Sequence, residues 1–316
     1  MTSSPTRLVC GGCGTEVPPE TPFAWACPAA VPGDDTDHVL RRVLDPAAAA
    51  AERAETERSA NPFLRYRRRF HSYHVARATG WSDERYVALV EELDASVARV
   101  DGSGFRTTPA LRSPALATEL GLSGDVWVKD ETGNVSGSHK ARHLMGVMLS
   151  LRVAESMGAA DPETPLAIAS CGNAALAAAV VARAAERRLL VFVPPSAEPA
   201  VIERLRTLGA ELEVCERQPG EAGDPTVARL MAAIAEGAVP FTVQGNLNGL
   251  AIEGGQTLAW ELVDQLNAAN STMDRLIVHV GGGAFASSAA AALEESVAGG
   301  QLKRLPVIDT VQTEGG

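Results

Sequence analysis

The chain has 316 residues, enough for about two domains and for a core that needs no disulfide or metal to fold. Its 28 Lys and Arg residues against 39 Asp and Glu give a net charge of −11, which repels nucleic acid and anionic membranes. The N-terminus shows no secretory signal, and no apolar stretch reaches bilayer length. The sequence therefore predicts a folded cytoplasmic protein that binds neither nucleic acid nor membrane.

Five cysteines in a chain without a visible export signal indicate reduced thiols or a metal site and not a disulfide framework. Cys10 and Cys13 form a Cys-x-x-Cys knuckle, and Cys27 follows at a distance typical of zinc ribbons. Ala30 stands where a second knuckle would supply the fourth ligand, and His38 can replace it only if the preceding loop folds back. Two interpretations stay open: a structural zinc site, and a degenerate ribbon that no longer binds metal.

Residues 45–104 read as a helical extension. An Ala-, Glu- and Arg-rich run over 45–60 predicts a solvated linking helix, and apolar residues at helical spacing predict a further helix over 83–100. Between them, residues 64–74 hold a cluster of arginines interleaved with aromatic residues. In a strongly acidic chain this cluster predicts salt bridges to another segment or subunit in preference to nucleic-acid binding.

Beyond residue 105 short β-branched runs alternate with alanine-rich helical stretches. The candidate strands are 125–131, 166–170, 189–193, 211–215, 241–244, 276–280 and 307–312. Most of these runs are too apolar to be half-exposed hairpin strands, and the connections between them have crossover length. The sequence therefore predicts an α/β architecture with largely parallel sheets and helices on both faces.

Polar or glycine-rich loops follow three of these strands, at the sheet edge where α/β proteins bind ligands. The first loop delivers Lys140 to a helix start, where burial lowers the pKa of an amine and makes it nucleophilic. The second, residues 170–173, is a tight turn into a buried helix, and the third, residues 281–284, offers backbone amides to a phosphate. Each loop alone is weak evidence for a binding site, because such loops are common, but the order of the three along the chain is specific.

Taken together, these motifs resemble the pyridoxal-phosphate enzymes of fold type II, the tryptophan synthase β-subunit superfamily. Within it the threonine synthase and threonine/serine dehydratase branches are most similar, and the resemblance runs from about residue 108 to 316. The matching motifs are Thr108-Pro109, Lys129 with Glu131, Ser138 to Lys140, Ser170 to Asn173, Val193-Pro194, Leu208 to Glu211, and Gly281 to Ala284. The Cys-x-x-Cys segment also resembles the leading segment of threonine synthases.

The resemblance implies two doubly wound, mostly parallel sheets with helices on both faces, preceded by a zinc-ribbon-like and helical N-terminal extension. The expected domains are a ribbon-like segment 1–44, the helical extension 45–104, a large cofactor-binding domain 105–144 plus 246–316, and a small nested α/β domain 145–245. The family's stretch carrying a hydroxyl or thiol that faces the pyridine nitrogen has no counterpart here. We therefore expect the large domain to be C-terminally incomplete, as in a fragment, a trimmed chain or one part of a split enzyme.

For the site, the resemblance implies that Lys140 holds pyridoxal 5′-phosphate as a Schiff base and later moves the α-proton of the substrate. Asn173 would hydrogen-bond the phenolic oxygen of the cofactor. The phosphate would be bound by Gly281, Gly282, Gly283 and Ala284, and the substrate carboxylate by Ser170, Cys171, Gly172 and Asn173. The metal ligands, if zinc is bound, would include Cys10, Cys13 and Cys27.

The implied activity is that of a lyase acting on a small amino acid by α-proton abstraction and β-elimination, in a homodimer. Three alternatives stay open: threonine synthase, a β-replacement synthase, and a pyridoxal-phosphate-binding protein with an incomplete site. Departures from the family pattern at His139, Ala141 and Asn134-Val135 bear on the substrate. His139 is interpreted as a planar ring in an aromatic slot, with a second acid or base as the alternative.

Overall fold

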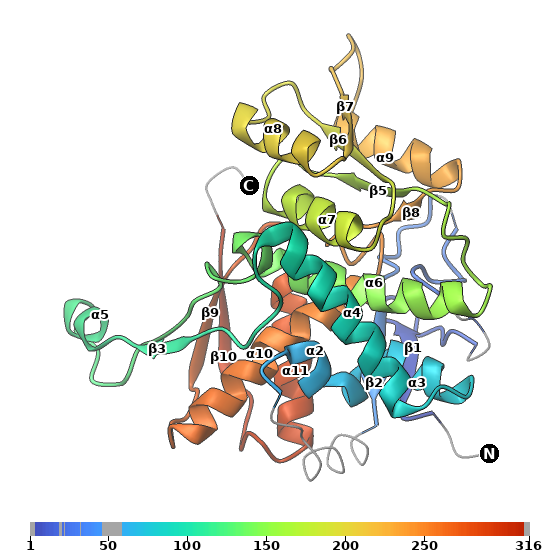
Figure 1. Ribbon diagram of the computed structural model, residues 1–316. Coiled ribbons are helices and arrows are strands. Elements are labelled where there is room, and N and C mark those ends of the chain that lie inside the picture. The colour runs from blue at the N-terminus through green and yellow to red at the C-terminus, as the bar shows by residue number, and fades with distance from the viewer. Residues whose placement is uncertain (1–3, 19–20, 22, 32, 46–58, 313–316) are drawn as a thin grey trace.

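A computed structural model describes residues 4–18, 21, 23–31, 33–45 and 59–312 (Figure 1). Most of the helix expected over 45–60, and the last four residues of the chain, lie outside the described residues. The chain opens with strand β1 (Thr6–Cys10), which pairs antiparallel with β2 (Leu40–Leu44). Alternate residues of both strands are buried, because the pair packs one face on the rest of the protein.

The helical extension contains α2 (Pro62–Arg65), a short 3-10 turn, α3 (His71–Ala78) and α4 (Asp83–Asp101). The helix expected over 83–100 is thereby confirmed. Ser82 caps α4 by accepting a hydrogen bond from the amide of Arg85, and Gly102 ends the helix in the left-handed conformation at φ 91°.

The arginine cluster forms salt bridges between segments. Arg67 pairs with Asp83 at 2.8 Å, and Arg65 reaches Asp264 at 2.7 Å. The guanidinium of Arg69 lies over the ring of Trp260, 4.9 Å from its centroid. The contacts confirm the expectation that these arginines join segments.

A four-stranded parallel sheet with strand order β7-β6-β5-β8 lies at the top of Figure 1. Its strands are β5 (Leu166–Ala169), β6 (Leu189–Val193), β7 (Glu211–Val214) and β8 (Val239–Pro240), and its helices are α7 (Asn173–Ala184), α8 (Pro199–Thr207) and α9 (Pro225–Ala235). Leu166 and Ile168 of β5 belong to the cluster that contains α7 and α8, whereas Ala167 belongs to the cluster that contains α9. Helices therefore cover both faces of this sheet, as the sequence predicts.

The prediction of a strand over residues 241–244 is wrong. The strand is β8, which consists of Val239 and Pro240, and the amide of Phe241 makes one more bond to Ala167 before the chain turns away. Residues 242–244 instead line a cavity. An apolar run after a strand cannot be distinguished from the strand itself by periodicity alone.

The rest of the α/β body is less regular than two complete doubly wound sheets. β9 (Arg275–His279) and β10 (Val307–Val311) pair in parallel, but β4 (Trp127–Lys129) pairs antiparallel with β3 (Ala110–Arg112). A strand therefore lies within the predicted 125–131, but it departs from the largely parallel pairing because the chain reverses direction after the short helix α5 (Pro114–Glu119). The remaining elements are a 3-10 turn (Val135–Gly137) and the helices α6 (Lys140–Ser156), α10 (Leu250–Ala268) and α11 (Ala284–Ala298).

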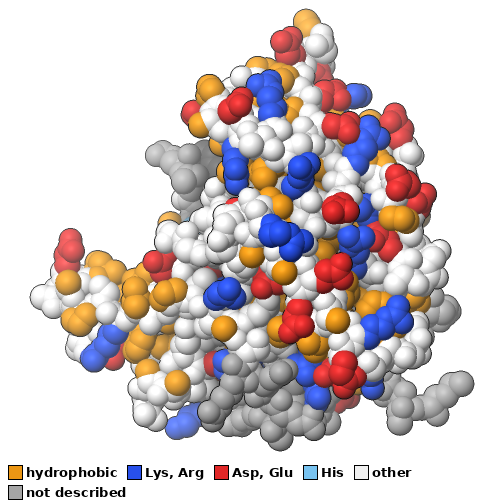
Figure 2. Space-filling model, in the orientation of Figure 1, with side chains coloured by type: hydrophobic (Ala, Val, Ile, Leu, Met, Phe, Trp, Pro, Cys, Tyr) orange, Lys and Arg blue, Asp and Glu red, His pale blue; other side chains and the backbone are white. Residues whose placement is uncertain are grey.

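Surface charges of both signs are intermixed over the face drawn in Figure 2. Apolar side chains gather on the projecting β3 and α5 region at its left, where Leu111, Leu120 and Leu122 are 55%, 59% and 54% exposed. In the described part of the chain, every helix is too short or too polar to cross a membrane.

Helices α6 and α10 cross at two glycines in the centre of the protein. A Cβ placed on Gly146 would lie 2.8 Å from the Cα of Gly254, and a Cβ on Gly254 would collide with the carbonyl oxygen of Arg142. Nearly all of α6 is buried, so neither backbone can move aside without disturbing the core. This close approach fixes the position of the α6 N-terminus relative to α10.

Replacing Gly254 by Ala is therefore expected to lower the free energy of unfolding by about 1–3 kcal/mol, because overpacking forces the helices apart. Urea unfolding measures the change. Gly124→Ala is the matched control, since a Cβ at Gly124 meets no atom within 4 Å, and its effect should stay within about 0.5 kcal/mol. Equal effects of the two substitutions would contradict this account of the crossing.

Candidate active site

A cavity of about 160 Å³ lies between the ends of β5 and β9 and the N-termini of α6 and α11. It is lined by His139, Lys140, Ala169, Ser170, Ala174, Thr242, Val243, Gln244 and residues 279–285. Both strands are in parallel pairs, and the cavity lies beyond their carboxyl ends. This is the edge at which open α/β sheets bind ligands.

A larger hollow of about 500 Å³ lies elsewhere, beside the C-terminal part of α7 and the start of β6. It is lined by Arg183, Glu186, Arg187, Arg188 and apolar residues, and its lining contains no lysine, cysteine, serine or histidine. Because it lies at the amino end of β6, it is on the wrong edge for the sites of open α/β sheets. The smaller cavity, which contains Lys140, is the better candidate for an active site.

Lys140 is the first residue of α6 and is held there by a strained turn. Ser136 adopts φ 55° and Gly137 φ 71°, and the Asn134 side-chain amide donates a 2.8 Å hydrogen bond to the carbonyl of Ser138. Burial lowers the pKa of the Lys140 ammonium, and no described carboxylate forms an ion pair with it. Lys140 is partly buried, and a partly buried amine without a counter-ion favours the neutral, nucleophilic form more than an exposed lysine does.

His139 precedes the lysine and its side chain packs among rings. Its imidazole lies 4.6 Å from the ring of Phe285 and 5.4 Å from that of His279. Burial, reinforced by the charges of neighbouring groups, lowers the pKa of His139 to about 2, so the ring is neutral at physiological pH. Among the described residues nothing pairs with its buried Nε2 atom, which leaves one nitrogen available to a bound molecule.

The glycine loop after β9 forms a second wall of the cavity. Gly283 adopts φ 77° and precedes α11, whose first amides are not engaged in helical hydrogen bonds. A Cβ at Gly281 or Gly282 would meet no atom, so the space beside both backbones is open. An open glycine backbone at the N-terminus of a 15-residue helix is suited to a phosphate.

The turn after β5 only partly matches its expected role. Ser170 lines the cavity, whereas the side chains of Cys171 and Asn173 are exposed, and Asn173 is not among the lining residues. The contact of Asn173 with a phenolic oxygen therefore stays a prediction. Sequence reasoning missed the segment 242–244 and Phe285, although the rule that ligands bind after parallel strands also applies to 242–244.

Four charged side chains lie behind the start of α6, and Arg142 and Glu261 among them are buried. The guanidinium of Arg142, which is 0% exposed, reaches Glu261 of α10 at 2.7 Å and Glu131 at 2.7 Å. Lys129 of β4 lies 2.7 Å from Glu261 and donates a further hydrogen bond to the carbonyl of Thr108. Two positive and two negative groups thereby balance, and their polar atoms are paired with one another.

The network has a defined dependence on pH. Burial by itself raises the pKa of Glu261, but the neighbouring Arg142 and Lys129 outweigh burial and hold it below its usual value. A carboxyl with a depressed pKa stabilises the fold above its unfolded pKa of about 4.3, and this contribution is lost as the pH falls through the lower folded value. The network is therefore intact at neutral pH.

Replacing Arg142 by Met should lower the free energy of unfolding by about 3–5 kcal/mol, because Glu131 and Glu261 lose the guanidinium that they share in the interior. Urea unfolding at pH 7 measures this change in the free energy of unfolding. Arg229→Met is the control, since Arg229 and Glu213 form a surface pair with side chains 53% and 45% exposed, and its loss should cost about 1 kcal/mol or less. The double variant Arg142→Met with Glu261→Met restores the charge balance and should recover part of the lost stability. An effect of Arg142→Met no larger than that of Arg229→Met would contradict the stabilising role of the network.

Replacing His139 by Phe keeps a planar ring between Phe285 and the cavity. If the imidazole offers only a neutral nitrogen, ligand affinity should fall by about tenfold at most, the equivalent of one hydrogen bond, with the pH profile unchanged. A general acid or base would instead cost about 10²–10⁴-fold in turnover. Activity across pH 6–9 separates the two, and a loss of that size or a shifted profile would contradict the neutral-ring interpretation.

The comparisons with known proteins agree on one family. The family described as pyridoxal-phosphate dependent enzyme matches residues 103–316. An L-serine dehydratase of Saccharomyces cerevisiae (strain AWRI1631) is 28% identical over 193 residues, which are 60% of this chain and 56% of that protein. A threonine synthase of Synechocystis sp. is 30% identical over 163 residues, 51% of this chain and 39% of that protein. The chain thus spans about half the length of the curated relatives it matches.

Solved structures show a related fold. A threonine deaminase from T.th. has a TM-score of 0.52 at 23% identity, and the match covers 71% of this chain and 64% of that one. A fungal L-serine ammonia-lyase from Rhizomucor miehei has a TM-score of 0.51 at 23% identity, with 66% and 60% of the two chains covered. At this identity the likeness concerns the fold alone.

Proposed function

The chain belongs to the family of pyridoxal-phosphate dependent enzymes, and on this premise we propose that it is a lyase acting on a small hydroxy amino acid. It would remove the α-proton and eliminate the β-hydroxyl, to give a 2-oxo acid and ammonia. The observation that carries the proposal is the position of Lys140, a partly buried amine without a described counter-ion in the cavity that the glycine loop lines. The similarity to an L-serine dehydratase supports the choice of reaction.

The cavity fits the cofactor in three respects: a free amine, an open glycine backbone at a helix N-terminus, and an unpaired buried imidazole nitrogen. Gly281 to Ala284 would hold the phosphate of the cofactor, and Lys140 would bind its aldehyde carbon. When bound, the cofactor supplies an electron sink that stabilises the carbanion formed at the substrate's α-carbon. The positive N-terminus of α11 complements the phosphate charge without any basic side chain.

Lys140 would act as the base at the α-carbon. Its Nζ takes the α-proton only when neutral, and burial favours that form because it lowers the pKa of the ammonium. Since the pKa is lowered, the neutral fraction at pH 7–9 exceeds that of an exposed lysine, and activity should rise with pH through this range. The packed rings of His139 and Phe285 restrict water on this side of the cavity.

The substrate carboxylate would lie at the turn after β5. Ser170 lines the cavity there, and the 12-residue helix α7 begins three residues later with its first amides unpaired in the helix. A helix N-terminus and a hydroxyl are together suited to a carboxylate. The exposed side chain of Asn173 would have to turn inward to reach the cofactor.

A second candidate function is threonine synthase, which releases phosphate from O-phosphohomoserine. It is favoured by the 30% identity with the threonine synthase of Synechocystis sp.. A substrate panel separates the two reactions: 2-oxo acid and ammonia from serine or threonine indicate the lyase, and inorganic phosphate from O-phosphohomoserine indicates the synthase. Absence of product from serine, threonine and O-phosphohomoserine would contradict both candidate functions.

Replacing Lys140 by Ala should abolish the visible absorbance of bound cofactor and reduce turnover by at least about 10²–10⁴-fold, because anchor and base are lost together. Spectra of the purified protein with added pyridoxal phosphate, and product assays, measure the two effects. Lys303→Ala is the matched control and should leave both unchanged. A Lys140→Ala protein with wild-type spectrum and turnover would contradict the proposed function.

A further inference from the structure

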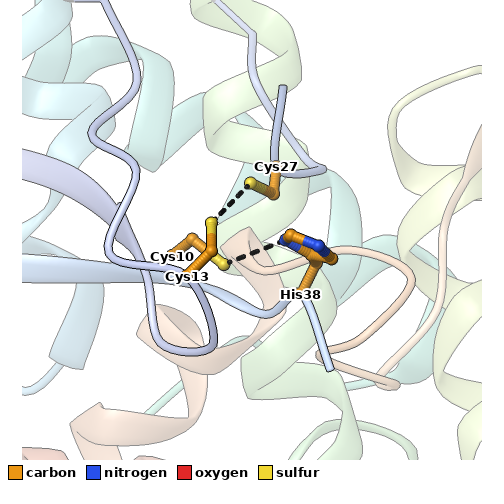
Figure 3. A group of neighbouring side chains, drawn as sticks. All are labelled: Cys10, Cys13, Cys27 and His38. Atoms are coloured by element: carbon orange, nitrogen blue, oxygen red, sulfur yellow. Dashed lines mark hydrogen bonds between the residues drawn. The ribbon is translucent and has the colours of Figure 1, made fainter. Parts of the chain in front are cut away.

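Three cysteines and one histidine of the N-terminal segment converge on one point (Figure 3). Cys10 ends β1, Cys13 lies in the turn after it, Cys27 comes from the following loop, and His38 lies just before β2. The three sulfurs and one ring nitrogen all lie within 4.8 Å of one another. The preceding loop therefore folds back to bring His38 into the place that Ala30 leaves unfilled.

Two of the distances between these atoms match the edges of a tetrahedron around a metal. Zinc–sulfur bonds of about 2.3 Å and zinc–nitrogen bonds of about 2.0–2.1 Å place two sulfurs about 3.8 Å apart, and a sulfur and a nitrogen about 3.6 Å apart. The Sγ atoms of Cys13 and Cys27 are 3.7 Å apart, and Cys10 Sγ lies 3.5 Å from His38 Nδ1. The four side chains are thus spaced as ligands of one ion.

His38 is held in a ligand orientation by a second residue. Its Nε2 lies 2.9 Å from the carboxylate of Asp34, which leaves Nδ1 directed at the sulfurs. Asp34 is fixed in turn by the backbone amide of Thr36, which donates to its other oxygen at 2.9 Å. A carboxylate on the far nitrogen is the usual support of a metal-bound histidine.

The backbone around the sulfurs is equally constrained. The amide of Cys10 donates to the carbonyl of Thr15 at 2.8 Å and that of Gly11 to Val39 at 2.8 Å, which ties the knuckle to the start of β2. A Cβ at Gly12 would collide with the carbonyl oxygen of Asp37. Only glycine allows the knuckle to approach the loop this closely.

We propose that Cys10, Cys13, Cys27 and His38 bind one Zn²⁺ ion in a closed structural site, and that this ion holds the N-terminal segment against the loop that lines the active-site cavity. Three thiolates and an imidazole in tetrahedral array select zinc over the oxygen-preferring cations. All four positions are filled by protein, which is the pattern of structural sites and leaves no open position for catalysis.

The connection to the cavity runs through residues on both sides of His38. The amide of Gly249 donates to the carbonyl of Trp25 at 3.0 Å, and a Cβ at Gly249 would collide with the carbonyl oxygen of Leu40. A Cβ at Gly245 would lie 3.8 Å from a methyl of Val39. Gly245 directly follows residues 242–244, which line the cavity, so the ion fixes the segments that support this wall.

Strand β2 also contacts helix α10 through a charged side chain. Arg42 lies 3.1 Å from Glu253 of α10 and donates to Gln256 at 2.7 Å, and both ionic side chains are 2% exposed. An ion that orders the turn before β2 therefore also orders the approach of Arg42 to α10. Loss of the ion should loosen the ribbon and the cavity wall together.

Zinc content is the direct test. Full-length protein purified without chelator should contain about one zinc ion per chain by elemental analysis, and Cys13→Ser or Cys27→Ser should contain almost none. Cys215→Ser, which removes a buried thiol outside the cluster, should keep the ion. Metal-free wild-type protein that stays metal-free after incubation with ZnCl₂, or Cys13 and Cys27 recovered as a disulfide under reducing purification, would overturn the proposal.

Asp34→Asn offers a finer test, since it keeps all four ligands and the shape of the loop. Competition with a chromophoric chelator should show zinc affinity lowered by about 10–100-fold, the usual effect of losing a ligand's carboxylate support. Asp35→Asn, the same change at the neighbouring exposed residue, should leave affinity unchanged. Equal affinities of both variants and wild type would contradict the role of Asp34 as the support of a metal-bound His38.

The effect on the cavity is measured on the wild-type chain. Removing zinc by chelation should lower the unfolding temperature and weaken pyridoxal-phosphate binding, and ZnCl₂ should restore both. Unchanged cofactor affinity after complete zinc removal would overturn the link to the cavity. Failure of the cofactor to bind with or without zinc would instead contradict the proposed function, since zinc content and unfolding are measured independently of it.

Discussion

The side chains of Lys129, Glu131, Arg142 and Glu261 form a network of ion pairs that joins β4, the loop after it, α6 and α10 directly behind Lys140. Arg142 lies two residues after Lys140, on the same first turn of α6, and its partners come from the loop after β4 and from α10. A buried guanidinium must keep all its partners, because an unpaired charge in the interior costs several kcal/mol. The position of Lys140 therefore follows from the requirement that Arg142 be neutralised.

The glycine crossing and the strained turn act on the same helix. Gly146 and Gly254 set how closely α6 approaches α10, while Ser136 in the left-handed region directs the chain into α6 at a fixed angle. Rigid elements on both sides of Lys140 hold its amine near the carboxyl ends of β5 and β9, where the N-terminus of α11 also lines the cavity. Such preorganisation is what a base and covalent anchor require.

Much of this arrangement could be predicted from the sequence, because local patterns determine it. The strand at 189–193 and the helix at 83–100 have strong periodicity or caps, and the loops containing Lys140 and Gly281 follow strands. The antiparallel β3–β4 pair, the boundary of β8 and the fourth ligand position of His38 depend on how distant segments fold back. No local pattern contains that information, and for the same reason the sequence alone does not mark Arg142 as the centre of a network.

The central claim, that Lys140 is the residue that binds pyridoxal phosphate, can be tested at the level of one atom. The chain contains only the lysines Lys129, Lys140 and Lys303, so borohydride reduction of the cofactor-loaded protein followed by peptide mass spectrometry identifies the bonded amine unambiguously. A pyridoxyl group is expected on the peptide that contains Lys140, in close to one copy per chain. Label on Lys129 or Lys303, or no stable label at all, would contradict it.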